Sequence, residues 1–459
     1  MQEQASSLLD KTLSRLLPLW GEIYSGRRSL DKLSLTPDLN DGDAEQLKHW
    51  MDACLSDHGG EVAARMRAAA LGRSFMELND LGRLRFLTLL SENYGADEVS
   101  IAQLIEHWQN SKGEKRAHIA SQLREALEPA RMKLLTQFNE LPEGIKFLVD
   151  MRADLLALRK QHPQLKPLES DLRRLLSAWF DVGLLHLERI SWNSKASLLE
   201  KLIAYEAVHE IKSWNDLKNR LDSDRRCFAF FHPNMPDEPL IFVEVALVNG
   251  LAGNVQHLLD EDVPVLDISQ ADTAIFYSIS NAQKGLAGIS FGNFLIKRVV
   301  RELQSEFPQL KQFSTLSPVP GFCQWLKQLK EADPEQEGIT LPVWLQSTLD
   351  TEFQYMQFDQ HQQTFVEDLA LHYLAREKRH HSEYALNPVA HFHLSNGARI
   401  ERLNWRADNS DKGLQQSAGL MVNYLYELAE IEHNSRQYSD FGEISLSPRL
   451  KKQLKGLNL

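Results

Sequence analysis

Apolar residues recur at every third or fourth position through the first 185 residues of the chain. Residues 44–55 (AEQLKHWMDACL) and 81–94 (LGRLRFLTLLSENY) show this spacing, which places the apolar side chains on one side of a helix. Short breaks containing Pro or Gly separate such segments. Another helix is predicted to start at residues 97–100, where Asp97 and Glu98 place negative charge in its first turn. The pattern predicts an antiparallel helical bundle over residues 1–185.

Strand-like segments begin after Trp192. We predict strands at residues 228–232, 239–248, 274–279 and 313–316, because each is an apolar run of strand length. Residues 388–394 and 399–407 are predicted to form a hairpin around Ser395-Asn396-Gly397, and residues 420–430 a helix. The fold class is therefore α+β, with the helical bundle followed by an α/β domain (residues 186–459) that has a mixed sheet.

A glycine-rich loop joins the strand at residues 274–279 to a predicted helix. The loop contains Gly285, Gly288 and Gly292, and the helix carries Leu295, Val299, Leu303 and Phe307 on one face. A helix N-terminus after such a loop can bind phosphate through its free N–H groups. The glycine spacing matches neither common nucleotide-binding fingerprint, so a phosphate site and a plain tight turn are equally consistent with it.

Composition narrows the classes of function. The 459-residue chain carries a net charge of −12, which argues against broad nucleic-acid binding. The three cysteines are far apart and lack metal-ligand spacing, which fits free thiols in a reducing compartment. The sequence shows neither a signal-peptide pattern at its start nor an apolar run long enough for a membrane span. We expect a cytoplasmic protein that binds neither nucleic acid nor membrane.

Two segments carry candidate chemistry. Ser317 follows the strand at residues 313–316 in a turn stiffened by Pro318, Pro320 and Gly321, at the strand end where ligands of α/β sheets collect. A serine that caps the next helix is an equally good interpretation. His391 and His393 would share one face of the predicted strand at residues 388–394. A third metal ligand is not evident, so one functional histidine is favoured over zinc, with a core histidine as the alternative.

Three segments resemble the malonyl-CoA decarboxylase family: residues 277–304, 314–326 and 384–405. The resemblance extends over about residues 192–441, and the helical first half fits the family's N-terminal helical domain. It implies a catalytic domain of GNAT acetyltransferase fold that converts malonyl-CoA to acetyl-CoA and CO2. It also implies that no metal, biotin or other cofactor is needed, and that the chain forms a homo-oligomer, a tetramer or a dimer.

The resemblance assigns roles to individual residues. Ser317 falls on the family's catalytic serine and His393 on its catalytic histidine. Tyr426 falls on a tyrosine that lines the family's site, although core packing is an equally good interpretation of Tyr426. The family's CoA-binding loop falls on Ala287, Gly288, Ile289, Ser290, Phe291, Gly292 and Asn293. This loop departs from the usual acetyltransferase phosphate-binding pattern. Lys297, Arg298 and Arg301 on the next helix are candidates for binding the CoA phosphates, although a solvated helix face is equally consistent with them.

The sequence therefore predicts a carboxy-lyase with malonyl-CoA as its substrate. Two alternatives are also compatible with the sequence. One is an acyl-CoA N-acyltransferase of the same fold, which would need an amine pocket and a base. The other is a non-catalytic acyl-CoA-binding module that uses the helical half as a docking surface.

Overall fold

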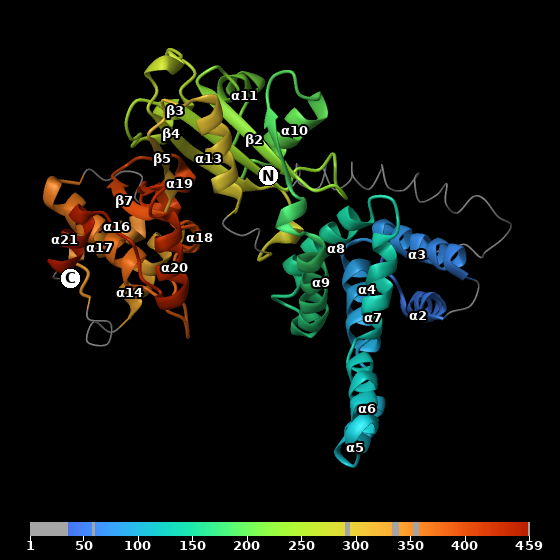
Figure 1. The fold of residues 1–459 in the computed structure, drawn as a ribbon. Coiled ribbons are helices and arrows are strands. Elements are labelled where there is room, and N and C mark those ends of the chain that lie inside the picture. Colours follow the sequence, from blue (N-terminus) through green and yellow to red (C-terminus); the bar gives the residue numbers. More distant parts are fainter. Residues whose placement is uncertain (1–34, 57–59, 290–293, 333–338, 352–357, 458–459) are drawn as a thin grey trace. The chain divides into compact units, whose positions relative to one another are not determined.

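The computed structural model describes residues 35–56, 60–289, 294–332, 339–351 and 358–457 (Figure 1). The chain divides into two compact units. The first comprises Met1–Leu185, His232–Pro239 and Gln283–Ser290; the second comprises His186–Phe231, Leu240–Ala282 and Phe291–Leu459. Among the described helices, none combines the length and the apolar composition that crossing a bilayer requires.

The first unit is helical, as its apolar periodicity predicts. Within the described residues, its α-helices are α2 (Asp41–Leu55), α3 (Gly60–Glu77), α4 (Asp80–Asn93), α5 (Glu98–Gln109), α6 (Gly113–Ala126), α7 (Ala130–Asn139), α8 (Gly144–Leu158) and α9 (Lys166–Trp179), with short 3-10 turns at Pro163–Leu165 and Val182–Leu184. Asp97 caps α5 by accepting hydrogen bonds from the N–H groups of Val99 and Ser100, which confirms the predicted helix start. Aromatic residues such as Phe86, Phe138 and Phe147 fill its core.

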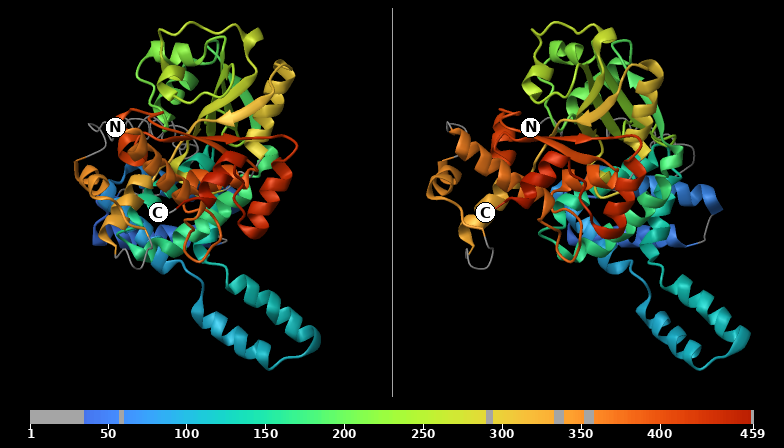
Figure 2. Two further views of the ribbon diagram at one scale, coloured as in Figure 1. Left: turned by 90° about the vertical axis from the view of Figure 1, so that its left-hand side faces the viewer. Right: turned by 60° about the vertical axis from the view of Figure 1, so that its left-hand side comes forward.

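Helices α5 and α6 form a hairpin that extends away from the other helices of the first unit (Figure 2). None of the residues of α5 is fully buried. Val99 is 68% exposed and Leu127, which follows α6, is 54% exposed. Apolar side chains of this size gain free energy when another surface covers them, so the hairpin is a candidate for contact between subunits.

The second unit contains one mixed sheet. Its strands are β1 (His186–Ile190), β2 (Arg225–Phe231), β3 (Ile241–Val248), β4 (Thr273–Asn281), β5 (Gln312–Thr315), β6 (Ser317–Pro318), β7 (Arg399–Asn404) and β8 (Met421–Leu425), in the order β1-β2-β3-β4-β5-β8-β6, with β7 also paired to β8. The β4–β5 pair is parallel and the other pairs are antiparallel. The predicted mixed sheet is confirmed.

Two strands separate in the middle of this sheet. The β4–β5 pairing runs from Thr273 opposite Gln312 to Phe276 opposite Thr315, although β4 itself continues to Asn281. Beyond Thr315 the chain turns toward β8, and Ser317 pairs with Val422 there. Because β5 leaves β4 at this point, Ser317 lies at the carboxyl end of the segment in which β4 and β5 pair.

Helices cover this sheet in the second unit. Helix α13 (Phe294–Glu306) lies against one face (Figure 1) and buries Leu295, Val299 and Leu303, as the helical spacing predicts. The other α-helices among the described residues of this unit are α10 (Ala196–Tyr205), α11 (Trp214–Arg220), α12 (Val255–Leu259), α14 (Phe322–Glu331), α16 (Val343–Thr351), α17 (Gln360–Ala375), α18 (Pro388–Ser395), α19 (Asp411–Ser417), α20 (Ile431–Phe441) and α21 (Pro448–Lys455).

The predicted hairpin at residues 388–407 is wrong in its first half. Pro388–Ser395 is helix α18, and its Asn387 side chain accepts hydrogen bonds from the N–H groups of Val389 and Ala390. Asn at the N-cap followed by Pro at the first helical position is a helix-start signal, which here outweighs the strand-like His-x-His alternation. Residues 399–404 do form a strand, β7, but it pairs with β8.

The helix predicted at residues 420–430 is also wrong. Met421–Leu425 is strand β8, which pairs with β5, β6 and β7. Its first four residues are all buried, because neighbouring elements cover the strand on both faces. Such a strand has no alternation between apolar and polar residues, so its periodicity cannot be distinguished from that of a buried helix.

Candidate functional site

Ser317 and His393 meet in the second unit. The Oγ atom of Ser317 lies 3.1 Å from Nε2 of His393, although the two residues are 76 positions apart in the sequence. Ser317 begins β6 and His393 lies in the last turn of α18. Both side chains are buried. The interpretation of Ser317 as a helix cap is wrong, since Gly321 occupies the N-cap of α14.

Two tyrosines from the β8 segment hold the His393 ring. The Tyr426 hydroxyl lies 2.8 Å from Nδ1, and the Tyr424 ring stacks on the imidazole with centroids 4.5 Å apart. Tyr426 is itself fixed because its N–H donates to the carbonyl of Phe313 at 2.8 Å. The structure thus brings together Ser317, His393 and Tyr426, which the sequence singled out, and adds Tyr424.

Burial controls the charge of this site. It lowers the pKa of His393 from 6.5 to about 3, because the protonated imidazole would lose its hydration. Burial also raises the pKa of Tyr426 and of Tyr424 well above 10. The site without substrate is therefore uncharged at neutral pH. A negatively charged substrate that entered would favour the protonated form of His393 and raise its pKa.

Thr315 is a further member of the site that the sequence analysis missed. The hydroxyl of Ser317 donates to Oγ1 of Thr315 at 2.9 Å, and the N–H of Tyr424 donates to the same oxygen at 3.3 Å. Thr315 ends β5 and is fully buried. Its spacing of two residues from Ser317 was the available signal, since alternate residues of an extended chain face the same side.

The turn after Ser317 is held by hydrogen bonds from three other elements. The N–H of Val319 donates to Ser417 Oγ at 3.0 Å, and the side-chain amide of Asn387 donates to the carbonyl of Pro320 at 2.8 Å. The hydroxyl of Tyr373 donates to the same carbonyl. Gly321 has φ of 85°, and a Cβ there would lie 2.8 Å from the Tyr373 hydroxyl. The turn therefore holds Ser317 in place and requires glycine at position 321.

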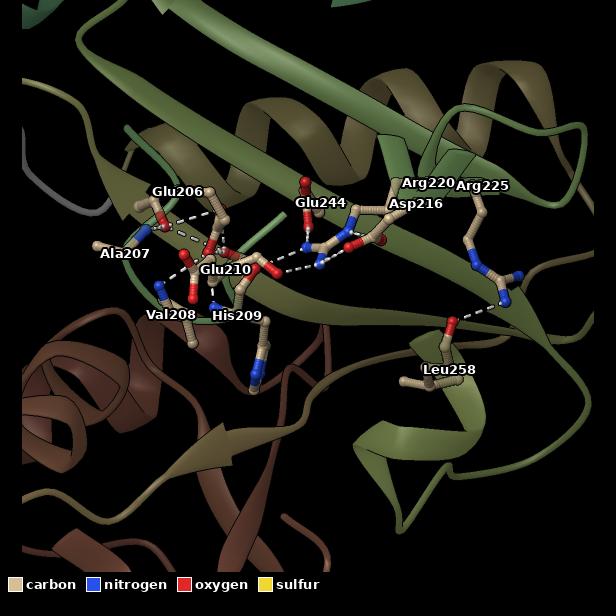
Figure 3. Close-up of polar contacts among 12 residues, drawn as sticks. Glu206, Ala207, Val208, His209, Glu210, Asp216, Arg220, Arg225, Glu244 and Leu258 are labelled. Atoms are coloured by element: carbon tan, nitrogen blue, oxygen red, sulfur yellow. Dashed lines mark hydrogen bonds and ion pairs between the residues drawn. The ribbon is translucent and has the colours of Figure 1, made fainter. Parts of the chain in front are cut away.

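A buried polar network fixes β4 beyond its pairing with β5 (Figure 3). The Glu206 carboxylate accepts hydrogen bonds from Ser278 and Ser280 on this part of β4 at 2.8–2.9 Å. Nearby, Arg220 binds Asp216 at 2.8 Å and Glu244 at 3.1 Å. Glu244 is completely buried, and its desolvation, with the charge of Glu206, raises its pKa to about 8. Polar side chains thus fix the part of β4 that extends beyond β5.

The predicted CoA-binding loop is described only in part. Ala287, Gly288 and Ile289 belong to the first unit, whereas Ser290, Phe291, Gly292 and Asn293 lie outside the described residues. Just before them, Arg152 of α8 donates to the carbonyl of Gly285. A Cβ at Gly285 would lie 1.7 Å from the carbonyl oxygen of Val149, so only glycine fits against α8 at this position.

The basic candidates on α13 are partly buried or exposed. Lys297 and Arg298 lie in the first two turns of the helix and are partly exposed, and Arg301 is exposed. Nothing in these positions tests whether the three side chains bind the CoA phosphates, so this role stays a prediction.

His391 does not join His393. Because both lie on helix α18, side chains two positions apart point to different sides, and the predicted common face is wrong. His391 Nδ1 instead lies 2.8 Å from the hydroxyl of Tyr438. Over the described ranges, no three His, Cys, Asp or Glu side chains are grouped so that they could hold a metal ion.

Comparisons with known proteins agree with this architecture. The model of the malonyl-CoA decarboxylase C-terminal domain matches residues 183–458, and that of the N-terminal domain matches residues 94–180. Mitochondrial malonyl-CoA decarboxylase of Mus musculus is 37% identical over 435 residues, which are 86% of this chain and 83% of that protein. The protein of the same name from Anser anser anser is 37% identical over 401 residues, 80% of this chain and 79% of that protein.

Solved structures give the same result. The malonyl-CoA decarboxylase of Rhodopseudomonas palustris has 39% sequence identity and a TM-score of 0.83, covering 89% of this chain and 99% of that one. The enzyme of the same name from Agrobacterium vitis has 40% identity and a TM-score of 0.79, with the same coverage. The chain belongs to the malonyl-CoA decarboxylase family.

Proposed function

We propose that this protein is a carboxy-lyase that converts malonyl-CoA to acetyl-CoA and CO2, and that Ser317 and His393 carry the reaction. The observation that carries the assignment is the buried contact of 3.1 Å between Ser317 Oγ and His393 Nε2. The substrate is inferred from membership of the family. The site provides a hydrogen-bond donor, Ser317, beside a titratable group, His393.

The chemistry needs two contributions from the protein. When the C–C bond to the carboxylate breaks, CO2 leaves and the electron pair moves into the thioester as an enolate. A preorganised donor at the developing oxyanion typically contributes about 3–4 kcal/mol, and the Ser317 hydroxyl is such a donor. A proton must then reach the α-carbon, and a positioned acid contributes about 10²–10⁴-fold in rate.

His393 is the proposed source of that proton. The malonyl carboxylate brings a negative charge into a buried, otherwise neutral site, and this charge favours imidazolium. One proton taken from solvent balances the reaction, because malonyl-CoA and one proton give acetyl-CoA and CO2. After the transfer, His393 returns to the neutral form that burial favours.

The CoA portion of the substrate is proposed to bind at residues 287–293, with Lys297 and Arg298 contacting its phosphates. This assignment, and the proposals that the enzyme needs no cofactor, forms a homo-oligomer and works in the cytoplasm, rest on the family resemblance and on composition.

The deciding experiment is incubation of the purified protein with malonyl-CoA alone, with separate detection of acetyl-CoA and CO2. We expect equal amounts of both products without any acyl acceptor. Product formed only when an amine is added would favour the N-acyltransferase, and binding without turnover would favour the non-catalytic module. Exhaustive chelation is expected to leave the rate unchanged; a loss that zinc restores would contradict the proposed absence of a metal.

A further inference from the structure

Thr315 contacts the proposed catalytic serine but has no direct contact with His393 among the hydrogen bonds of the described residues. We propose that Thr315 is a positioning residue: its Oγ1 accepts the Ser317 hydrogen before substrate binds, and so orients the serine hydroxyl that later donates to the substrate. This inference rests on the proposed decarboxylase activity. Three observations carry it.

The first observation is that Thr315 is itself immobilised. Its side chain is fully buried. Its carbonyl accepts a hydrogen bond from the side-chain amide of Asn423 at 2.8 Å, and its Oγ1 accepts the N–H of Tyr424 at 3.3 Å. Both partners lie on β8, the strand that leads to Tyr426. Through Thr315, Ser317 is therefore connected to β8, the strand whose segment also contacts His393.

The second observation concerns the direction of the hydrogen bonds. The buried Tyr426 hydroxyl has Nδ1 of His393 as its hydrogen-bond partner within the described residues, so we assign it as the donor to that nitrogen. Neutral His393 then carries its proton on Nε2 and donates it to Ser317 Oγ. Since that bond uses a lone pair of the serine, the serine's own hydrogen goes to Thr315.

The third observation is the number of available hydrogens. Ser317 has one hydroxyl hydrogen, and this hydrogen points at Thr315. To donate to the thioester or carboxylate oxygen of the substrate, this hydrogen must leave Thr315 by rotation about the Cβ–Oγ bond. The His393 N–H can stay on Oγ while the serine hydroxyl rotates. Thr315 is therefore the acceptor that the substrate oxygen replaces.

A double-mutant cycle tests this role. Thr315→Val keeps the shape of the side chain and removes the acceptor, whereas Thr315→Ser keeps the acceptor. We expect Thr315→Val to lower kcat about tenfold, the size of one lost hydrogen bond, with KM nearly unchanged. Thr315→Ser should restore most of the rate. In a Ser317→Ala background, Thr315→Val should lower kcat almost no further, because the serine hydroxyl that Thr315 orients is already absent.

The matched control is Thr273→Val. Thr273 is a fully buried threonine at the start of the neighbouring strand β4, and its hydroxyl donates to Asp272. This variant should retain the wild-type kcat. Thr315→Ala serves as a second acceptor-free variant if Thr315→Val does not fold.

The possible outcomes separate this inference from the proposed function. An equal loss of kcat from Thr315→Val in the wild-type and Ser317→Ala backgrounds would show a purely structural role and overturn the inference. A normal kcat in either acceptor-free variant would do the same. A wild-type protein that does not turn over malonyl-CoA would overturn the proposed function, and the role of Thr315 with it.

Discussion

The hydroxyl of Tyr426 lies 2.8 Å from the one nitrogen of His393 that does not contact Ser317. We assign the buried tyrosine hydroxyl as the donor to Nδ1, which places the hydrogen of the neutral imidazole on Nε2. Ser317 and Tyr426 therefore contact the two ring nitrogens of the same imidazole. The proposed mechanism depends on this arrangement.

The ring protonation can be measured directly. We expect two-dimensional nitrogen–proton NMR of histidine-labelled protein at pH 7 to show His393 as the neutral Nε2–H form, with His393→Asn identifying its signals. Tyr426→Phe removes the donor and should shift the ring toward a mixture of the two neutral forms. A wild-type ring protonated on Nδ1 would contradict the assigned direction of the hydrogen bonds.

Removing either member of the Ser317–His393 pair should damage turnover and spare CoA binding. We expect Ser317→Ala and His393→Asn each to lower kcat by at least about two orders of magnitude. The double variant should lose little more than the worse single variant, since the two residues act as one unit. Affinity for CoA, measured by calorimetry, should change little.

The neighbouring histidine is the control for this experiment. His391→Asn should lower kcat far less than His393→Asn, because His391 contacts Tyr438 and is not part of the Ser317–His393 pair. Equal damage from His391→Asn and His393→Asn would make the choice between the two histidines wrong. Near-normal kcat in Ser317→Ala would make the serine assignment wrong.

Burial of His393 should also make the protein sensitive to acid. The folded pKa of about 3 lies below the ordinary value of 6.5, so between these values the unfolded chain binds the proton and the native chain does not. Stability from this residue is complete above pH 6.5 and falls as the pH drops toward 3, by about 1.4 kcal/mol per pH unit.

The test compares the free energy of unfolding of wild type and His393→Asn by urea denaturation at pH 6.5 and pH 4.5. The wild type should lose roughly 2–3 kcal/mol more than the variant over this interval. His391→Asn, which removes a less buried histidine, should follow the wild type more closely. Parallel losses in wild type and His393→Asn would show that His393 titrates normally.

The Arg220 network should contribute strongly to stability. Arg220→Met leaves the buried carboxylate of Asp216 without its arginine, and breaking such a pair costs about 3–5 kcal/mol. Arg436→Ala is the comparison, because its ion pair with Asp440 is largely exposed and worth under about 1 kcal/mol. If thermal denaturation showed equal stability for the two variants, the proposed contribution of the buried network to stability would be contradicted.

The exposed apolar side chains of the α5–α6 hairpin motivate a prediction about assembly. We expect sedimentation at micromolar concentration to give a mass above the 52.5 kDa of one chain. Charged substitutions at Val99 and Ile105, both exposed on α5, should lower that mass without unfolding the protein. A wild-type monomer at this concentration would contradict the prediction.

The sequence alone determined those elements whose signals lie within a few residues. Helical periodicity located α13 and its buried face, and Asp97 marked the start of α5, because side-chain spacing and capping act over one helical turn. The apolar runs of β3 and β4 likewise identified strands. Ser317 and His393 were selected by their turn and by family resemblance, without any indication from spacing that they touch.

Only the tertiary structure decided the rest. The β8 run has no alternation because neighbouring elements bury it on both faces, so its strand character depends on partners far away in the sequence. The His-x-His segment became a helix once Asn387 capped it. The contact of Ser317 with His393 needs β5 to leave β4 and turn toward β8, a path set by strand pairing. Burial of that contact then sets the charge of the histidine, since desolvation depends on the atoms packed around the ring and not on its neighbours in the sequence.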